Sequence, residues 1–348
     1  MKPAGTWQGE CPHETTVNRG PGYRGFRLSR WKVLPLVLLG WCCLALPAGL
    51  ARAAAPAAPL PVAATILPLG DFCQKIGGDL VQVQVLIPPG ASPHAFEPAP
   101  SVMARASQAR VFVYIGAGLE PWATKLLRSR GPDNLVVVEA ARGIPLLGMS
   151  PHHHGHPPAG AGDHDDHHPG EAAAPDSHLA GNPHIWLDPV LAQEICRKIA
   201  RAFIQADPGH RAQYEANLNT YLAALTELNQ EIEATARTWR LRDFVSFHPS
   251  FSYFARRYNL HEVGTIEEAP GREPTPRHLQ DLVAAIRRYG IKVVFAEPQL
   301  NPRVAEVIAQ EAGVKVLRLD PMGGAPPYGS DYLLLMRANL AALDQALR

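Results

Sequence analysis

The chain has 348 residues, a formal net charge of +1 and 46% hydrophobic residues. This length allows two domains of about 150 residues each, and the hydrophobic content is ample for a core in both. A net charge near zero offers no basic surface for nucleic acid or for an anionic membrane, so we expect no nucleic-acid partner.

Residues 1–55 have the pattern of an export signal preceded by an upstream extension. Basic residues precede the apolar stretch Val33–Leu50, and the small-x-small cleavage pattern Ala51-Arg52-Ala53 follows it. We predict a secretory signal peptide that is removed near Ala53, and a periplasmic mature protein. The alternative is a retained membrane anchor, but two prolines interrupt the short apolar stretch. Cys42 and Cys43 lack the small residue that precedes a lipid-modified cysteine, so we do not expect a lipoprotein.

Residues 56–206 alternate between short apolar segments and helix-like segments, which predicts an open α/β lobe. Val81–Ile87 alternates apolar and polar residues, as a half-buried strand does. Two β-branched, apolar runs are typical of strands buried in a parallel sheet. These runs are Ala109–Ile115 and Leu135–Glu139; a further strand is predicted at Val62–Leu67, and helices at Ser101–Gln108 and Glu120–Ser129.

The segment Pro151–His178 within this lobe is rich in histidine, aspartate, glycine and proline. Short His-rich tracts are typical of metal binding, and the glycines and prolines predict a surface loop. The alternatives are an engineered tag or a chance insert, although a tag normally lies at a terminus. We predict a loop of secondary, weak metal sites formed by its eight histidines, His152, His153, His154, His156, His164, His167, His168 and His178.

Asp188-Pro189 and Asp207-Pro208 each place a carboxylate before a proline, which predicts two helix starts. The second opens a long helix, roughly Gly209–Trp239, of about 45 Å. We predict that residues 207–240 form a rigid linking helix between the first lobe and a second α/β lobe, residues 241–348. In the second lobe, strands are predicted at Phe244–Phe247, Ile291–Ala296 and Val314–Leu319, and helices at Ser250–Tyr258, Pro276–Tyr289, Pro302–Ala312 and Tyr328–Leu347.

Polar residues that follow predicted strands are the candidate ligands, because open α/β sheets bind ligands beyond the carboxyl ends of their strands. His94, His248 and Asp320 each follow a predicted strand, and His184 precedes a helix. Two come from each lobe, so a cleft between two Rossmann-like lobes can assemble them. Three imidazoles and a carboxylate match tetrahedral Zn²⁺. Glu297, at another strand end, is a candidate for orienting a ligand.

Each candidate also has an ordinary structural interpretation. His94 can be a solvated loop residue, His184 a brace for the turn before its helix, and His248 a buried, hydrogen-bonded histidine. Asp320 and Pro321 can simply form a turn. After removal of the signal peptide only Cys73 and Cys196 remain, and we expect buried thiols while leaving their pairing open.

Several segments resemble the periplasmic metal-receptor subunit of bacterial zinc/manganese ABC transporters. They are Gly90–Pro98, Leu119–Trp122, Asn182–Pro189, Phe247-His248 with Tyr253–Tyr258, and Phe295–Gln299, and the resemblance runs from about Ala58 to the C-terminus. It implies metal ligands at His94, His184, His248 and Asp320. It implies the zinc type, because the manganese members place a carboxylate where His248 stands. Pro249 departs from the acidic residue that many relatives have at that position.

Together with this resemblance, the residues predict a high-affinity periplasmic zinc receptor that acts as a monomer. Delivery of Zn²⁺ to an inner-membrane ABC permease and its ATPase is what the resemblance implies. Nitrogen ligands favour Zn²⁺ over Mn²⁺. We do not expect an enzyme, because the sequence has no HExxH, GxSxG or GxxxxGK[ST] motif. The alternatives are a receptor for manganese or another divalent metal, a metal-storage or adhesive surface protein, and a zinc hydrolase.

Overall fold

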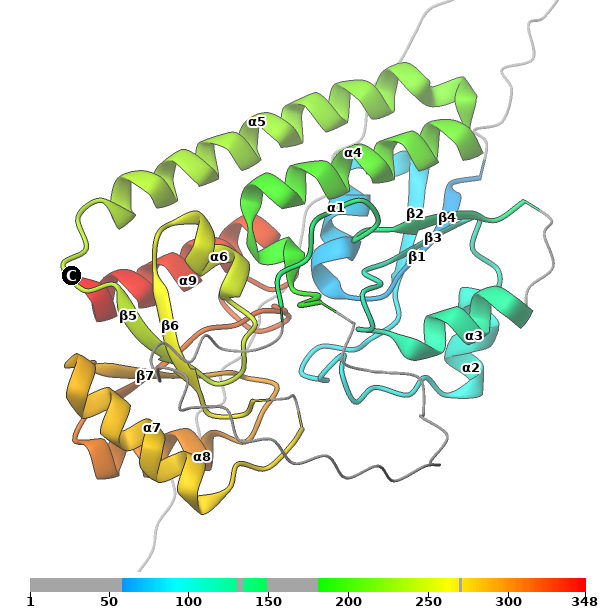
Figure 1. The fold of residues 1–348 in the computed structure, drawn as a ribbon. Coiled ribbons are helices and arrows are strands. Elements are labelled where there is room, and N and C mark those ends of the chain that lie inside the picture. Colours follow the sequence, from blue (N-terminus) through cyan, green and yellow to red (C-terminus); the bar gives the residue numbers. More distant parts are fainter. Residues whose placement is uncertain (1–57, 130–133, 149–180, 269–270) are drawn as a thin grey trace, which may run out of the picture. The chain divides into compact units, whose positions relative to one another are not determined.

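The computed structural model describes residues 58–129, 134–148, 181–268 and 271–348. These residues all belong to one compact unit, residues 56–348. They form two α/β lobes, each built on a parallel four-stranded sheet, with a long helix between the two in the chain (Figure 1). The predicted signal peptide and the His-rich loop lie outside the described residues.

The first sheet contains β1 (Leu60–Ala64), β2 (Val81–Val85), β3 (Val111–Tyr114) and β4 (Val136–Glu139) in the order β2-β1-β3-β4. The helices of this lobe are α1 (Leu67–Gly77), α2 (Pro100–Ala106), α3 (Pro121–Ser129) and α4 (Pro189–Ala206). All four predicted strands are present. The first ends at Ala64, earlier than expected, because α1 begins at Leu67 with Pro68 in its first turn, where a proline is favoured.

The second sheet contains β5 (Asp243–Ser246), β6 (His261–Thr265), β7 (Val293–Ala296) and β8 (Lys315–Arg318) in the order β6-β5-β7-β8. Its helices are α6 (Ser252–Arg257), α7 (Pro276–Tyr289), α8 (Pro302–Ala312) and α9 (Tyr332–Leu347). The edge strand β6 was missed in the sequence. Its five residues, HEVGT, include a glycine and two charged or titratable side chains, and pairing with β5 supplies the strand.

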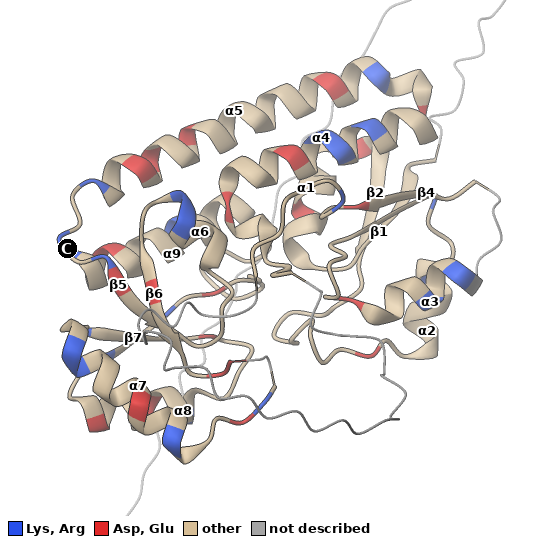
Figure 2. Ribbon diagram, viewed as in Figure 1, with Lys and Arg blue, Asp and Glu red and all other residues tan. Residues whose placement is uncertain are grey.

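The linking helix α5 (Arg211–Ala236) has 26 residues, a length of about 39 Å at 1.5 Å per residue. Asp207 was expected to cap it, but a short 3₁₀ turn, Pro208–His210, comes first. The Asp207 carboxylate instead accepts hydrogen bonds from the Tyr214 hydroxyl at 2.8 Å and from the His210 Nδ1 at 2.7 Å. Acidic and basic residues are interspersed along α4 and α5 (Figure 2).

Helix α5 contacts both lobes along its length. Near its start, the Asn217 amide donates to the Ile76 carbonyl of α1 at 2.9 Å. Near its end, Asn229 accepts from the Tyr258 hydroxyl at 2.9 Å and Glu231 pairs with Arg337 of α9 at 2.8 Å. The helix therefore braces the two lobes at several points.

Cys73 and Cys196 are both buried in the core of the first lobe, and both are free thiols. This agrees with the expectation of buried thiols. Among the described residues, no helix is both long enough and apolar enough to cross a membrane.

Candidate metal centre

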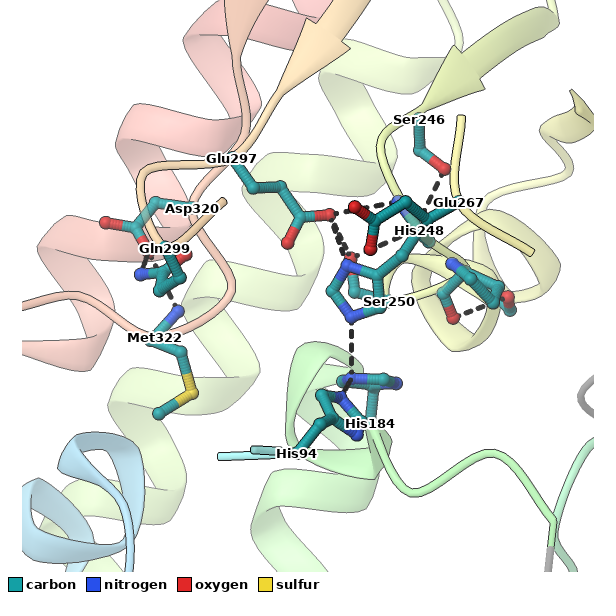
Figure 3. Close-up of polar contacts among 12 residues, drawn as sticks. His94, His184, Ser246, His248, Ser250, Glu267, Glu297, Gln299, Asp320 and Met322 are labelled. Atoms are coloured by element: carbon teal, nitrogen blue, oxygen red, sulfur yellow. Dashed lines mark hydrogen bonds and ion pairs between the residues drawn. The ribbon is translucent and has the colours of Figure 1, made fainter. Parts of the chain in front are cut away.

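Three histidines from separate segments of the chain meet where the two lobes adjoin (Figure 3). His94 lies in the loop after β2, His184 directly precedes the 3₁₀ turn that leads into α4, and His248 follows β5 by two residues. The Nε2 atom of His184 lies 3.0 Å from that of His94 and 3.1 Å from that of His248. One ring nitrogen from each residue fits within a span of 4.8 Å.

The partners of His184 set its tautomer. Its Nδ1 lies 2.8 Å from the Oδ1 of Asn182, which also accepts from the backbone N–H of His184 at 3.0 Å. The Asn182 amide cannot be flipped, because its Nδ2 donates to the carbonyl of Pro249 at 2.6 Å. Nδ1 therefore carries the proton in the neutral ring, and Nε2 presents a lone pair.

The partners of His248 set the same tautomer. Its Nδ1 lies 2.8 Å from the Oε1 of Glu297, and both side chains are almost fully buried. A carboxylate only accepts, so Nδ1 donates and Nε2 presents its lone pair. The Oε1 of Glu297 also accepts from the Ser250 hydroxyl at 3.0 Å, which orients the carboxylate.

Two lone pairs that face each other at 3.1 Å repel, unless a cation lies between them. Tetrahedral Zn²⁺ with Zn–N bonds of about 2.0–2.1 Å places neighbouring nitrogens about 3.3 Å apart. The two Nε2 separations around His184, 3.0 Å and 3.1 Å, are close to this value. The histidine nitrogens therefore have the chemistry and the spacing of a cation site.

Burial keeps two of the rings neutral. Burial first, and then the neighbouring His248, lower the pKa of His94 to about 3. Burial, with His248 and His94, lowers the pKa of His184 well below its usual value. For His248, burial lowers the pKa, but the charge and hydrogen bond of Glu297 outweigh it, so the net shift is upward. Only neutral imidazole binds a metal ion.

The three histidines line a cavity of about 10 Å³ together with Glu297 and Gln299. A single water needs roughly 10–15 Å³. The space enclosed by the three imidazoles is therefore about the size of a single ion or water.

Asp320, the fourth predicted ligand, is not brought together with the histidines. Its Oδ1 accepts from Gln299 Nε2 at 2.9 Å and from the backbone N–H groups of Met322 and Gly323, at 2.9 Å and 3.0 Å. Its Oδ2 accepts from the Tyr328 hydroxyl at 2.6 Å. Figure 3 shows Asp320 and Gln299 apart from the three imidazoles. Donors of its own loop bond to both carboxylate oxygens in this arrangement, and direct coordination by Asp320 stays a prediction.

The structure places Glu297 beside His248, where the sequence suggested an orienting role, and Asp188 at the start of α4. Asp188 accepts from the backbone N–H groups of Val190 and Leu191, as an N-cap does, and also pairs with Arg257 at 2.8 Å.

Two contributors near the histidines were missed in the sequence. Asn182 holds His184, and Tyr253 donates to the Asn182 carbonyl at 2.7 Å while accepting from the Leu147 N–H at 3.0 Å. Both residues lie in segments that carry the family resemblance, Asn182–Pro189 and Tyr253–Tyr258, and that was the available signal. The contact between them spans 71 residues, so the sequence did not show what either side chain holds.

The family follows from comparison of the sequence. Residues 62–346 match the family described as ZnuA, zinc-uptake complex component A periplasmic. The chain belongs to this family. It is 31% identical over 292 residues to the high-affinity zinc uptake system protein ZnuA of Bacillus subtilis, an alignment that covers 83% of this chain and 88% of that protein.

Two further ZnuA-family comparisons agree with the first. The chain is 29% identical over 287 residues to the zinc-binding protein AdcA of Streptococcus pyogenes, covering 81% of this chain but only 55% of AdcA. A crystal structure of a ZnuA deletion mutant with zinc bound superposes with a TM-score of 0.69 at 34% identity, covering 83% of this chain and 98% of the other. The two-lobed fold is thus that of solved ZnuA structures.

Proposed function

We propose that this member of the ZnuA family binds Zn²⁺ through His94, His184 and His248 and delivers it to an ABC permease and its ATPase. The observation that carries the proposal is the pair of Nε2 lone pairs of His184 and His248, which face each other at 3.1 Å. Asn182 and Glu297 hold the two rings in the tautomers that a metal requires. The zinc-binding relatives, including the zinc-bound ZnuA structure, support the choice of metal.

Zinc is favoured over manganese by the donor set. Imidazole nitrogens suit Zn²⁺, whereas carboxylate, carbonyl and water oxygens suit Mn²⁺. The metal-facing atoms of the cluster are three ring nitrogens, and the nearest carboxylate, Glu297, is engaged with the far nitrogen of His248. A manganese receptor of the same family is therefore the weaker alternative.

A receptor fits the site better than an enzyme does. A catalytic zinc site keeps an open coordination position that substrate can reach. Here the space that all three histidines line measures only about 10 Å³, and His184 is 1% exposed. We infer a monomeric, periplasmic carrier without a lipid anchor. Its lobes are residues 56–206 and 241–348, and residues 207–240 link them. We also infer weak sites in the loop 151–178 that collect metal ions.

Zinc titration of the metal-free protein tests the proposal, with competition against a chelator of known affinity. The wild type should show one tight site. His248→Ala should weaken that site by more than the roughly 10–100-fold that is typical when a second-shell partner is lost.

His261→Ala is the matched control, since His261 is an exposed histidine on β6 that pairs with Asp243 at 3.0 Å. This variant should bind zinc as the wild type does. A wild type without a tight site, or equal affinities for all three proteins, would show that the histidine cluster is not the zinc site.

A further inference from the structure

Strand β6 carries a partly buried carboxylate, Glu262, beside the loop that presents His248. The Oε1 of Glu262 accepts a short hydrogen bond from the hydroxyl of Ser246, the last residue of β5. Its Oε2 accepts at 3.0 Å from the hydroxyl of Ser252, the first residue of α6. Residues 247–251 lie between the two serines. Glu262 therefore joins the two ends of the loop from which one of the three imidazoles projects.

Each of the two serine hydroxyls has a single hydrogen and two possible acceptors. The Oγ of Ser246 lies 3.0 Å from the His248 carbonyl oxygen (Figure 3), and the Oγ of Ser252 lies 3.1 Å from the Pro249 carbonyl oxygen. Burial raises the pKa of Glu262 to about 7, although both hydroxyls lower it, so the carboxyl is ionised at about pH 8. Hydrogen bonds to a charged acceptor are about twice as strong as those to a neutral one. Both hydroxyls therefore donate to Glu262.

A different carboxylate, Glu297, holds the centre of this loop. Its Oε1 lies 2.8 Å from His248 Nδ1 and accepts from the Ser250 hydroxyl at 3.0 Å. These bonds orient the imidazole ring, but they do not tie the two ends of the loop together. The first end is fixed by the sheet, because the Ser246 carbonyl accepts from the Ile266 N–H at 3.1 Å.

The second end of the loop depends on Glu262. Ser252 lies outside the sheet, and within the described part of the chain Glu262 is the one side chain that bonds to both flanking serines. Without this carboxylate, the Ser252 hydroxyl is left with the Pro249 carbonyl, which already accepts from Asn182 Nδ2 at 2.6 Å. Loss of Glu262 therefore also disturbs the amide that orients His184.

We propose that Glu262 is a positioning residue for zinc binding, which acts through Ser246 and Ser252 and fixes the backbone from which His248 reaches the ion. The inference rests on the proposed zinc-binding function, and Glu262 is not a member of the histidine cluster itself. Binding groups must be held within about 0.5 Å of their productive geometry by the residues around them. Loss of such support typically weakens metal binding by about 10–100-fold.

Zinc affinities at about pH 8, measured by competition with a chelator of known affinity, test the proposal. Glu262→Ala should weaken zinc binding about 10-fold, the lower end of the range for an outer partner. Glu262→Gln should stay within about 2-fold of the wild type. Its Oε1 accepts from one serine and its Nε2 donates to the other, whose own hydrogen then passes to the loop carbonyl. Rescue by glutamine separates an effect of position from an effect of charge.

A cycle with the double variant Ser246→Ala/Ser252→Ala tests the route. In that background Glu262→Ala should weaken zinc binding by no more than about 2-fold further, because the hydrogen bonds are already lost. Asp207→Ala is the matched control, since it removes a carboxylate that also accepts from two side chains, in the turn between α4 and α5. This control should lower the free energy of unfolding and leave the zinc affinity unchanged.

If Glu262→Ala does not fold, Ser252→Ala decides the matter. It removes one of the two bonds and should weaken zinc binding about 3-fold, half of the free energy of a 10-fold effect. A Ser252→Ala variant with the wild-type affinity would then overturn the inference.

Three other outcomes would also overturn it: a Glu262→Ala variant that binds zinc as the wild type does, a Glu262→Gln variant as weak as Glu262→Ala, or an undiminished effect of Glu262→Ala in the background without the serines. Each of these leaves the tight zinc site of the wild type intact. Failure of the proposed function is a different result, namely a wild type without a tight zinc site or a His248→Ala variant that binds normally.

Discussion

The contact between His248 and Glu297 offers the sharpest test of how the site works. Glu297→Gln retains an oxygen that can accept from His248 Nδ1 but removes the negative charge, which lies 2.8 Å away in a buried place. Loss of such an outer partner typically weakens metal binding by about 10–100-fold. Because the hydrogen bond can persist, we expect the lower end, about 10-fold or 1.4 kcal/mol, at pH 8.

The pH dependence of zinc binding should also change, in a direction that the pKa shifts determine. In the wild type, burial lowers the pKa of His248, but the charge and hydrogen bond of Glu297, together with the charges of Glu262 and Glu267, outweigh burial and raise the pKa above the usual 6.5. Protonated imidazole cannot bind zinc, so wild-type affinity falls as the pH drops through this raised pKa. In Glu297→Gln, burial dominates and the pKa falls. The variant should therefore lose affinity only at lower pH, and the 10-fold gap should narrow towards about pH 6.

Zinc titrations between about pH 6 and pH 8 measure both effects. Glu227→Gln, which neutralises an exposed carboxylate on α5, is the matched control and should follow the wild type throughout. The reasoning is refuted if Glu297→Gln binds zinc as tightly as the wild type at pH 8, or if the gap between them is the same at every pH.

Four other measurements bear on the structure. Tyr253→Phe loses a hydroxyl that bridges Asn182 and Leu147, so the free energy of unfolding in urea should fall by about 1–3 kcal/mol; an unchanged midpoint would contradict this. Gly116 has a φ of +81°, and Gly116→Ala would place its Cβ 2.7 Å from Glu139 Oε1. The free energy of unfolding, measured in the same urea assay, should therefore fall by at least about 1–2 kcal/mol. An unchanged free energy of unfolding would mean that the turn can adapt. Small-angle scattering should show little change in the radius of gyration on zinc binding, because α5 contacts both lobes; a large compaction would argue for hinge closure. Deletion of residues 151–178 should abolish only weak zinc binding in calorimetry, and loss of the tight site would refute the division of roles.

Local sequence signals predicted most of the elements. The cap-and-proline pairs at Thr275-Pro276 and Asn301-Pro302 begin α7 and α8 at the predicted residues, and in both the cap side chain accepts a backbone N–H. The signal failed at Asp207, whose carboxylate bonds to Tyr214 and His210 instead of capping α5. β6 lacked a local signal, because its pairing with β5 and not its composition makes it a strand.

For the candidate metal centre, the sequence by itself predicted the three histidines that the structure brings together. His94 and His248 follow strands, and the end of a strand can be predicted from a few neighbouring residues, because a β-branched run stops where turn residues begin. Only the tertiary structure decided how these imidazoles are held. His184 meets His94 across 90 residues and His248 across 64, and Gln299 donates a hydrogen bond to Asp320 across 21. The tautomer of each ring and the hydrogen bonds of each carboxylate depend on which donors and acceptors face them. The packing of the two lobes brings those partners together.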